Sequence, residues 1–211
     1  MKLIDRIERK MGRFYVPELM KYLCLAMAGV LVLDYLPLSS ASAFLCFDRD
    51  AILHGEIWRV FTFMFVMMPS GLLTDLIKLY FYFFLGTALE RYWGSRKFNL
   101  YILIGWLCNV VCGFTVGVAI SDFLYATLLL AFAILYPETQ VMLFFVIPVK
   151  VKWLGWAAAA MTVYELIVYP AAYKLTLLFS LVPFLLFFWK DCYLQIKLWI
   201  RHIRFRLTTR R

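Results

Sequence analysis

The sequence offers one pair of residues for serine-hydrolase chemistry, which requires a hydroxyl nucleophile and a base within hydrogen-bond reach. Ser121 is the candidate nucleophile, and His54 and His202 are the two histidines. His202 falls in the basic C-terminal tail, which leaves His54 as the candidate base. We favour a simpler interpretation, in which His54 is a solvated loop residue and Ser121 caps the start of a helix. On this interpretation the chain has no catalytic residue.

Several ionisable residues fall within or beside apolar stretches, where a charge is costly and often functional. Most lie within a turn or two of a predicted helix end, where water or snorkelling lowers the cost: Asp34, Asp75, Lys78, Glu90 and Asp122. Glu165 lies deepest, and it could either line a hydrated cavity or pair with a neighbour such as Lys174. The five cysteines include no Cys-x-x-Cys pattern, so we predict neither a metal site nor a cofactor.

Composition shows what kind of chain must position these residues. Hydrophobic residues make up 64% of the 211 positions, far above the share in an ordinary soluble domain. The sequence is therefore that of a polytopic membrane protein. Its formal net charge of +9 could suggest nucleic acid, but the cations gather before the first apolar segment and after the last. That pattern favours the positive-inside rule, with both termini cytoplasmic, and membrane lipid as the partner.

The apolar segments predict six membrane-spanning helices in an all-α fold. They cover about residues 22–38, 75–90, 98–120, 122–136, 153–170 and 175–189. The fourth and sixth are short for a hydrocarbon core of roughly 30 Å. We expect longer neighbours to shield them, or the bilayer to thin around them. A long outer loop, residues 39–75, should lie partly in the interface, and residues 138–151 form a second loop.

Three regions follow from this topology. Residues 1–21 form a basic amphipathic cytoplasmic segment, residues 22–190 the six-helix membrane domain, and residues 191–211 a basic cytoplasmic tail. The tail could dock a cytosolic partner or anionic lipid. Gly113 and Gly117 form a small-xxx-small pattern suited to close helix packing, either within the bundle or between subunits.

Three short motifs occur in order along these helices. Trp58 and Arg59 lie in the outer loop, Gly86 and Glu90 form a Gly-x-x-x-Glu pattern in the second span, and Ala-Phe-Ala-Ile-Leu-Tyr-Pro occupies 131–137. Together they make the chain resemble the rhomboid superfamily over about residues 20–190. That resemblance implies a six-helix bundle whose long first loop is half-embedded in the outer leaflet. Trp58 and Arg59 would then pin this loop, or serve as ordinary interfacial anchors.

The resemblance also locates the positions where a rhomboid protease carries its chemistry. In those enzymes the nucleophile is the Ser of a Gly-x-Ser-Gly motif that starts the fourth span, and the base is a His in the sixth. The alignment through residues 131–137 places Asp122 at the nucleophile position, and both flanking glycines are absent. The sixth predicted span contains no histidine. The resemblance therefore implies a rhomboid scaffold without the catalytic pair.

A derlin-like function follows from a retained scaffold with a missing catalytic pair. Such a protein would bind transmembrane segments of client proteins, as in membrane-protein quality control. One alternative is a diverged intramembrane serine protease that uses Ser121 and His54, and another is a small transporter built around Glu165. The membrane would be a bacterial inner membrane or the endoplasmic reticulum, and the sequence does not distinguish them.

Overall fold

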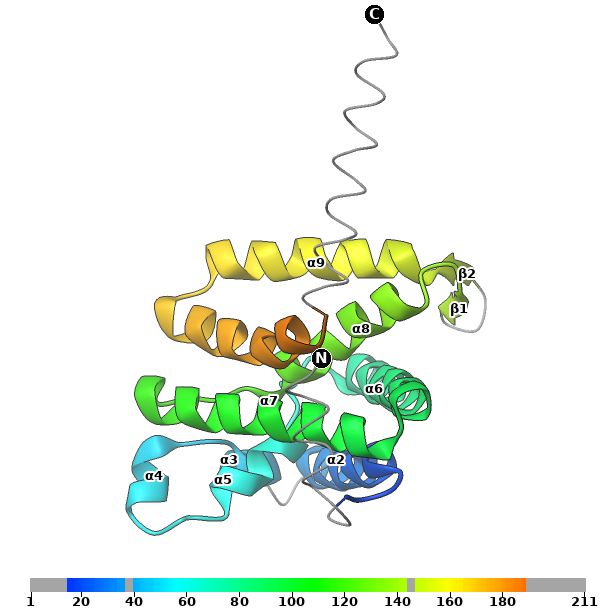
Figure 1. Cartoon of the computed structure of the whole chain (residues 1–211). Helices are drawn as coiled ribbons and strands as arrows, with labels where there is room; N and C mark the ends of the chain where they lie inside the picture. Colours follow the sequence, from blue (N-terminus) through cyan, green and yellow to red (C-terminus); the bar gives the residue numbers. More distant parts are fainter. Residues whose placement is uncertain (1–14, 37–39, 144–146, 189–211) are drawn as a thin grey trace, which may run out of the picture.

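A computed structural model describes residues 15–36, 40–143 and 147–188, and this part of the chain is nearly all helical (Figure 1). The predicted N-terminal segment belongs to it only from residue 15 onward. The predicted basic tail, residues 191–211, lies outside the described residues together with His202.

Long helices make up most of the fold. They are α2 (Leu19–Tyr35), α6 (Leu72–Trp93), α7 (Ser95–Val116), α8 (Ser121–Leu135), α9 (Val151–Val168) and a last helix, Ala171–Phe188, drawn in orange in Figure 1. The outer loop holds short helices, α3 (Ala41–Leu45), α4 (Arg49–Leu53) and α5 (Arg59–Thr62), and the 3-10 turn η1 (Phe63–Phe65). Strands β1 (Gln140–Leu143) and β2 (Ile147–Lys150) pair antiparallel, with Gln140 opposite Lys150.

The helices differ from the expected spans in length and in one connection. Among the described residues, four helices are long and apolar enough to cross a membrane: α6, α7, α9 and the last helix. The expectation of a short sixth span is therefore wrong, because that helix has 18 residues. The expectation of a short fourth helix is confirmed, since α8 has 15. The all-α prediction missed the β1–β2 hairpin, which replaces the predicted loop after Pro137.

One set of helix ends lies together and is joined by side-chain contacts; we call it the inner end. The Glu90 carboxylate near the end of α6 accepts hydrogen bonds from the first turn of α2. Ring contacts join the end of α6 to the ends of two other helices, Tyr92 to Tyr136 after α8 and Trp93 to Phe188 in the last helix. Gly94, with φ +81°, lets α7 begin directly after α6, because glycine adopts positive φ without strain.

The opposite set of helix ends forms the outer end. Tyr35 at the end of α2 bonds to Asp75 in the first turn of α6. The carbonyl of Gly117, just after α7, accepts a hydrogen bond from the Arg49 N–H in the outer loop. Ser121 at the start of α8 bonds to the backbone of residue Val66. The long helices therefore alternate in direction, and the outer loop covers one end of the bundle.

Helix α8 lies in the core and α9 at the edge. Leu124, Tyr125, Leu128 and Ala131 of α8 are completely buried, and α8 contacts both α6 and α9. Only Val151 and Gly155 of α9 are buried. Figure 1 shows α9 along the upper edge of the molecule, on the side away from α2 and the short outer-loop helices. The short helix is thus shielded by longer neighbours, as expected.

Candidate functional site

The structure does not bring the two candidate catalytic residues together. Ser121 is 3% exposed, and its hydroxyl donates a hydrogen bond to the carbonyl of Val66 at 2.6 Å. His54 is exposed at the end of α4, and its Nδ1 lies 2.6 Å from the carbonyl oxygen of Asp50. Among the described residues, no hydrogen bond joins Ser121 to the imidazole of His54. The Ser121 side chain instead bonds to the outer loop, and the His54 side chain to the backbone of its own helix.

The expected helix-capping role of Ser121 also differs from what is found. Helix α8 begins at Ser121 itself, Ile120 occupies the cap position, and no side-chain cap bond is made there. The hydroxyl reaches across to the outer loop instead of back to its own helix. The residue therefore joins α8 to the segment that follows η1.

Asp122 joins the same two parts of the molecule. Its carboxylate accepts a hydrogen bond from the Met68 N–H at 2.9 Å and one from the Tyr82 hydroxyl at 3.5 Å. Lys78 Nζ lies 3.8 Å from it. The Asp122 carboxylate therefore serves as an acceptor that holds the loop residues 66–70.

A second carboxylate completes this polar cluster. Asp75 is only 1% exposed, and it accepts hydrogen bonds from the Ser70 N–H and the Tyr35 hydroxyl, both at 3.1 Å. Lys78 Nζ lies 3.6 Å from Asp75. We call Asp75, Lys78 and Asp122 the outer polar cluster. Ion pairs and hydrogen bonds offset the cost of placing these charges in the membrane domain.

A serine–lysine contact within this region also requires consideration, because such pairs act in some hydrolases. Lys78 Nζ donates to the Ser70 hydroxyl at 2.6 Å and to the Met68 carbonyl at 2.9 Å. In this contact the lysine is the hydrogen-bond donor, and its Nζ also lies 3.6 Å from the Asp75 carboxylate and 3.8 Å from the Asp122 carboxylate. The arrangement fixes the loop at residues 68–70.

A cavity of about 260 Å³ opens beside Ser121. The outer loop and the start of α8 form its walls, and most of its lining is apolar: Ser42, Ala43, Cys46, Phe63, Val66, Met67, Met68, Pro69, Ala119, Ile120 and Ser121. A cavity of this size can hold a large apolar side chain. Across the described residues, no group of three or more His, Cys, Asp or Glu side chains could hold a metal ion.

Trp58 and Arg59 act on the outer loop itself. Arg59 is 7% exposed, and its guanidinium donates to the carbonyls of Ala43 and Cys46 at 2.8 and 3.1 Å, and to the Glu56 carboxylate at 2.5 Å. These bonds tie α3 to α5. The Trp58 ring is half exposed at the surface, which suits an interfacial anchor. The two neighbours thus have different functions, one internal and one at the surface.

Gly86 and Glu90 pack α6 against α2 at the inner end. A Cβ added at Gly86 would overlap the Met20 side chain, so the glycine allows the close approach. Glu90 accepts from the N–H groups of Leu19 and Met20 at 3.1 and 3.3 Å. Glu18, at the cap position of α2, makes no side-chain cap bond. Glu90 therefore caps α2 from a neighbouring helix. Its carboxylate suits this position, because the N-terminus of a helix carries unpaired N–H groups and favours a negative charge.

Within the described part of the chain, Gly113 and Gly117, predicted to favour close helix packing, have different surroundings. A Cβ added at Gly113 would overlap the Phe47 ring of the outer loop. Gly117 has φ +96° and no atom within 4 Å of an added Cβ, so it serves the turn that ends α7. Gly113 is thus a contact for the loop, and Gly117 a backbone turn.

Glu165 lies in the outer half of α9, and its expected pairing with Lys174 is not found. Within the described part of the chain, its side chain makes no hydrogen bond or ion pair. Its neighbours Tyr164 and Ile167 are exposed. This carboxylate is therefore a polar group on an otherwise apolar and loosely packed helix surface.

The sequence indicated some of these partners and not others. Asp75 and Lys78 are three residues apart on one helix, a spacing that predicts an ion pair. Tyr35 and Ser70 were not anticipated, because they reach Asp75 from other segments, and Tyr82 was not anticipated, because it bonds across to Asp122 on another helix. No local pattern marks a contact such as that of Met68 with Asp122, which are 54 positions apart.

Comparison with known proteins places the chain in a family. No curated protein matches it. A family model described as eukaryotic integral membrane protein (DUF1751) matches residues 20–189, which include all the long helices of the described structure except the first residue of α2. The helices of the structure that suit a membrane agree with that description. The chain therefore belongs to the eukaryotic integral membrane protein family DUF1751.

Proposed function

We propose that this protein is a proteolytically inactive, rhomboid-like membrane protein that binds transmembrane segments of client proteins, as in membrane-protein quality control. Its membrane domain would comprise six spans, with α2 and α8 as the two short ones. The eukaryotic family favours the endoplasmic reticulum over a bacterial inner membrane. Transmembrane clients and surrounding lipid would be its main partners, with a cytosolic partner at the basic tail.

The distribution of charge supports this topology. The inner end carries the cations at the start of α2, in the α6–α7 turn and beside the hairpin: Lys21, Arg91, Arg96, Lys97, Lys150 and Lys152. The outer end has fewer, and two of these, Arg59 and Lys78, are held by carboxylates. The positive-inside rule then favours an inner end that faces the cytoplasm.

The absence of protease chemistry is supported by what Ser121 and Asp122 do. The Ser121 hydroxyl donates a hydrogen bond to the Val66 carbonyl, and the Asp122 carboxylate accepts one from the Met68 N–H. A nucleophile needs a base in reach, and neither side chain has one among its hydrogen-bond partners in the described structure. These contacts support the proposal that the position assigned to the nucleophile by the rhomboid resemblance serves in this protein to hold the outer loop.

The single observation that carries client binding is the outer half of α9. Its side chains are mostly exposed, Ile167 by 70%, and α9 packs on α8 near Gly155, where an added Cβ would overlap Ala133. In a bilayer the hydrophobic effect does not hold helices together, so a weakly packed helix surface can exchange lipid for another helix at little cost. The Glu165 carboxylate on this surface could bond a polar residue of a client segment.

Site-specific photo-crosslinking tests this proposal. A photoreactive amino acid would replace Ile167 on α9 or, as a matched control, Leu107, an exposed apolar residue of α7. The model client is a single transmembrane segment of leucines with one central asparagine. We expect crosslinks from position 167 and few from position 107, and weaker crosslinking in Glu165→Leu. Equal crosslinking from the two positions would show that α9 is not a binding surface.

A further inference from the structure

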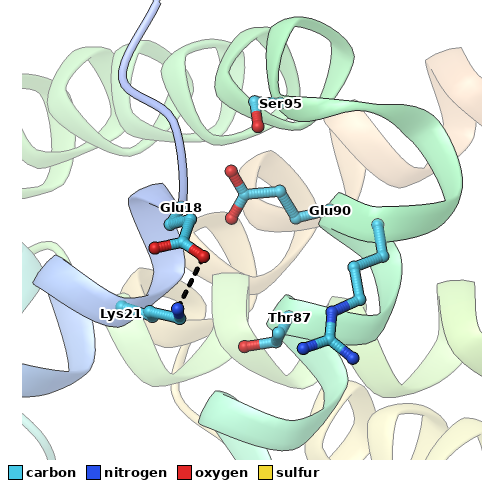
Figure 2. A pocket seen from close by; sticks show the side chains of 6 residues that line it. Glu18, Lys21, Thr87, Glu90 and Ser95 are labelled. Atoms are coloured by element: carbon cyan, nitrogen blue, oxygen red, sulfur yellow. Dashed lines mark hydrogen bonds and ion pairs between the residues drawn. The ribbon is translucent and has the colours of Figure 1, made fainter.

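A small cavity lies at the inner end, and none of its lining residues belongs to α9. It lies where the start of α2, the end of α6 and the start of α7 meet, and its volume is about 90 Å³. Six residues line it: Glu18, Lys21, Thr87, Glu90, Arg91 and Ser95. Figure 2 shows Glu18 and Lys21 on one side of this space, with Thr87, Glu90 and Ser95 around the rest of it.

The negative charges of the cavity are already engaged. Glu90 is 6% exposed, and both its oxygens accept hydrogen bonds from the first turn of α2. Glu18 forms an ion pair with Lys21 at 2.6 Å. Arg91, in contrast, makes no hydrogen bond or ion pair within the described part of the chain. The cation left without a protein partner is therefore a guanidinium, the side chain best suited to bind phosphate oxygens.

The hydroxyl groups of the cavity also lack partners. Thr87 Oγ1 is buried and has no hydrogen-bond partner, the only such side-chain atom among the described residues. A threonine inside a helix usually bonds a carbonyl one turn back, and a buried hydroxyl without a partner is costly. The cavity must supply that partner, either as water or as an oxygen atom of a ligand.

The start of α7 adds positive potential on the same side. Ser95 is its first residue, and the helix has neither a capping side chain nor an acidic residue in its first turn. The unpaired N–H groups at such a terminus attract anions. The cavity thus combines a free guanidinium, two hydroxyls and a helix terminus, at an end of the bundle where lipid headgroups would lie.

We propose that this cavity binds the phosphate group of a phospholipid headgroup. Arg91 supplies the main counter-charge, the Thr87 and Ser95 hydroxyls supply neutral hydrogen bonds, and the acyl chains lie along the apolar surfaces of α2 and α6. The site would fix one lipid at the junction of three helices, and it operates independently of the α9 surface.

Thermal unfolding of the full-length protein in detergent, with three added compounds, tests the proposal. Dioctanoylphosphatidic acid carries the phosphate and the tails, dioctanoylglycerol has the tails alone, and inorganic phosphate has the anion alone. We expect a raised unfolding midpoint with dioctanoylphosphatidic acid only. Inorganic phosphate acting equally well would identify a soluble anion as the ligand and overturn the lipid assignment.

Variants separate the cavity from general charge attraction. Arg91→Gln should weaken the apparent affinity for dioctanoylphosphatidic acid by about tenfold or more, as expected for one lost charge-assisted bond. Thr87→Val, which keeps the shape and removes the hydroxyl, should weaken it less. Lys97→Gln removes a cation from the same end, outside the cavity lining, and should change it little. If Thr87→Val raises the midpoint without lipid and leaves the lipid response unchanged, the cavity holds only water and the proposal fails.

Discussion

Helices α8 and α9 lie side by side, yet they differ in almost every physical respect. Helix α8 is short, and residues along its length are completely buried. Helix α9 is longer, but only two of its residues are buried. Helix α8 is therefore packed into the interior of the protein, whereas most side chains of α9 lie at its surface. Under the proposed function, α8 supplies rigidity and α9 the binding surface.

The largest loss of stability should follow when a buried leucine side chain of α8 is truncated. Leu128 is completely buried, so Leu128→Ala leaves a cavity and should lower the free energy of unfolding by about 2–5 kcal/mol. Reversible denaturation in detergent measures this loss. A change below about 1 kcal/mol, the level of an average mutation, would mean that α8 is not the packed centre of the domain.

A smaller loss should follow when the start of α8 is released from the outer loop. In Asp122→Ala, the Met68 N–H loses its acceptor and Lys78 loses one of its two carboxylates. The expected loss is about 1–3 kcal/mol, with faster hydrogen exchange at residues 66–70. Asp122→Asn keeps an acceptor oxygen and serves as the control. If both variants exchange at the wild-type rate, Asp122 does not hold the loop.

The hairpin between the two helices should respond to pH through Glu138. Hydrogen bonds from Lys150 at 2.9 Å and Lys152 at 3.2 Å, together with their charges, lower the pKa of this exposed carboxyl below its usual value. Because the folded pKa is lower than the unfolded one, the stabilisation is present above the unfolded pKa and is lost as the pH falls through the folded pKa.

Hydrogen exchange in the hairpin, compared between near-neutral pH and acid, measures this effect after correction for the intrinsic rate. Protection should fall on acidification in the wild type and change less in Glu138→Gln, which cannot titrate. Added salt should diminish the difference, since the three side chains are exposed. An equal fall in both proteins would show that Glu138 does not tether the hairpin to α9.

The smallest effect on stability should come from α9. Ile167→Ala removes a side chain that touches little of the protein, so the free energy of unfolding should stay within about 0.5 kcal/mol of the wild-type value. The same detergent assay applies. A loss comparable to that of Leu128→Ala would mean that the outer half of α9 is packed, and the contrast between the two helices would disappear.

The sequence predicted the helices well because apolar composition and length determine which segments suit a membrane. It also identified Trp58, Arg59, Gly86 and Glu90 as residues of interest. It did not show what each contacts: Glu90 caps α2 across 70 positions, and Gly113 packs under Phe47. Spacing within one helix cannot reveal which other segment comes close.

The β1–β2 hairpin was missed for a related reason. Residues 138–151 contain an apolar run, but a short run does not distinguish a strand from a loop or a buried turn. Its pairing depends on a partner strand a few residues away and on the anchoring of Glu138 by two lysines. The sequence also did not show that α9 is exposed, because composition gives the hydrophobicity of a helix and not which of its surfaces other helices cover.

The most direct test for serine-hydrolase chemistry at α8 is labelling of the folded, membrane-embedded protein with a fluorophosphonate probe for serine hydrolases. Ser121→Ala and His54→Ala are the controls. We predict no labelling of the wild-type protein, because the Ser121 hydroxyl is buried and bonded to a backbone carbonyl. Labelling that disappears in Ser121→Ala would contradict this and identify Ser121 as an activated serine with an unrecognised base.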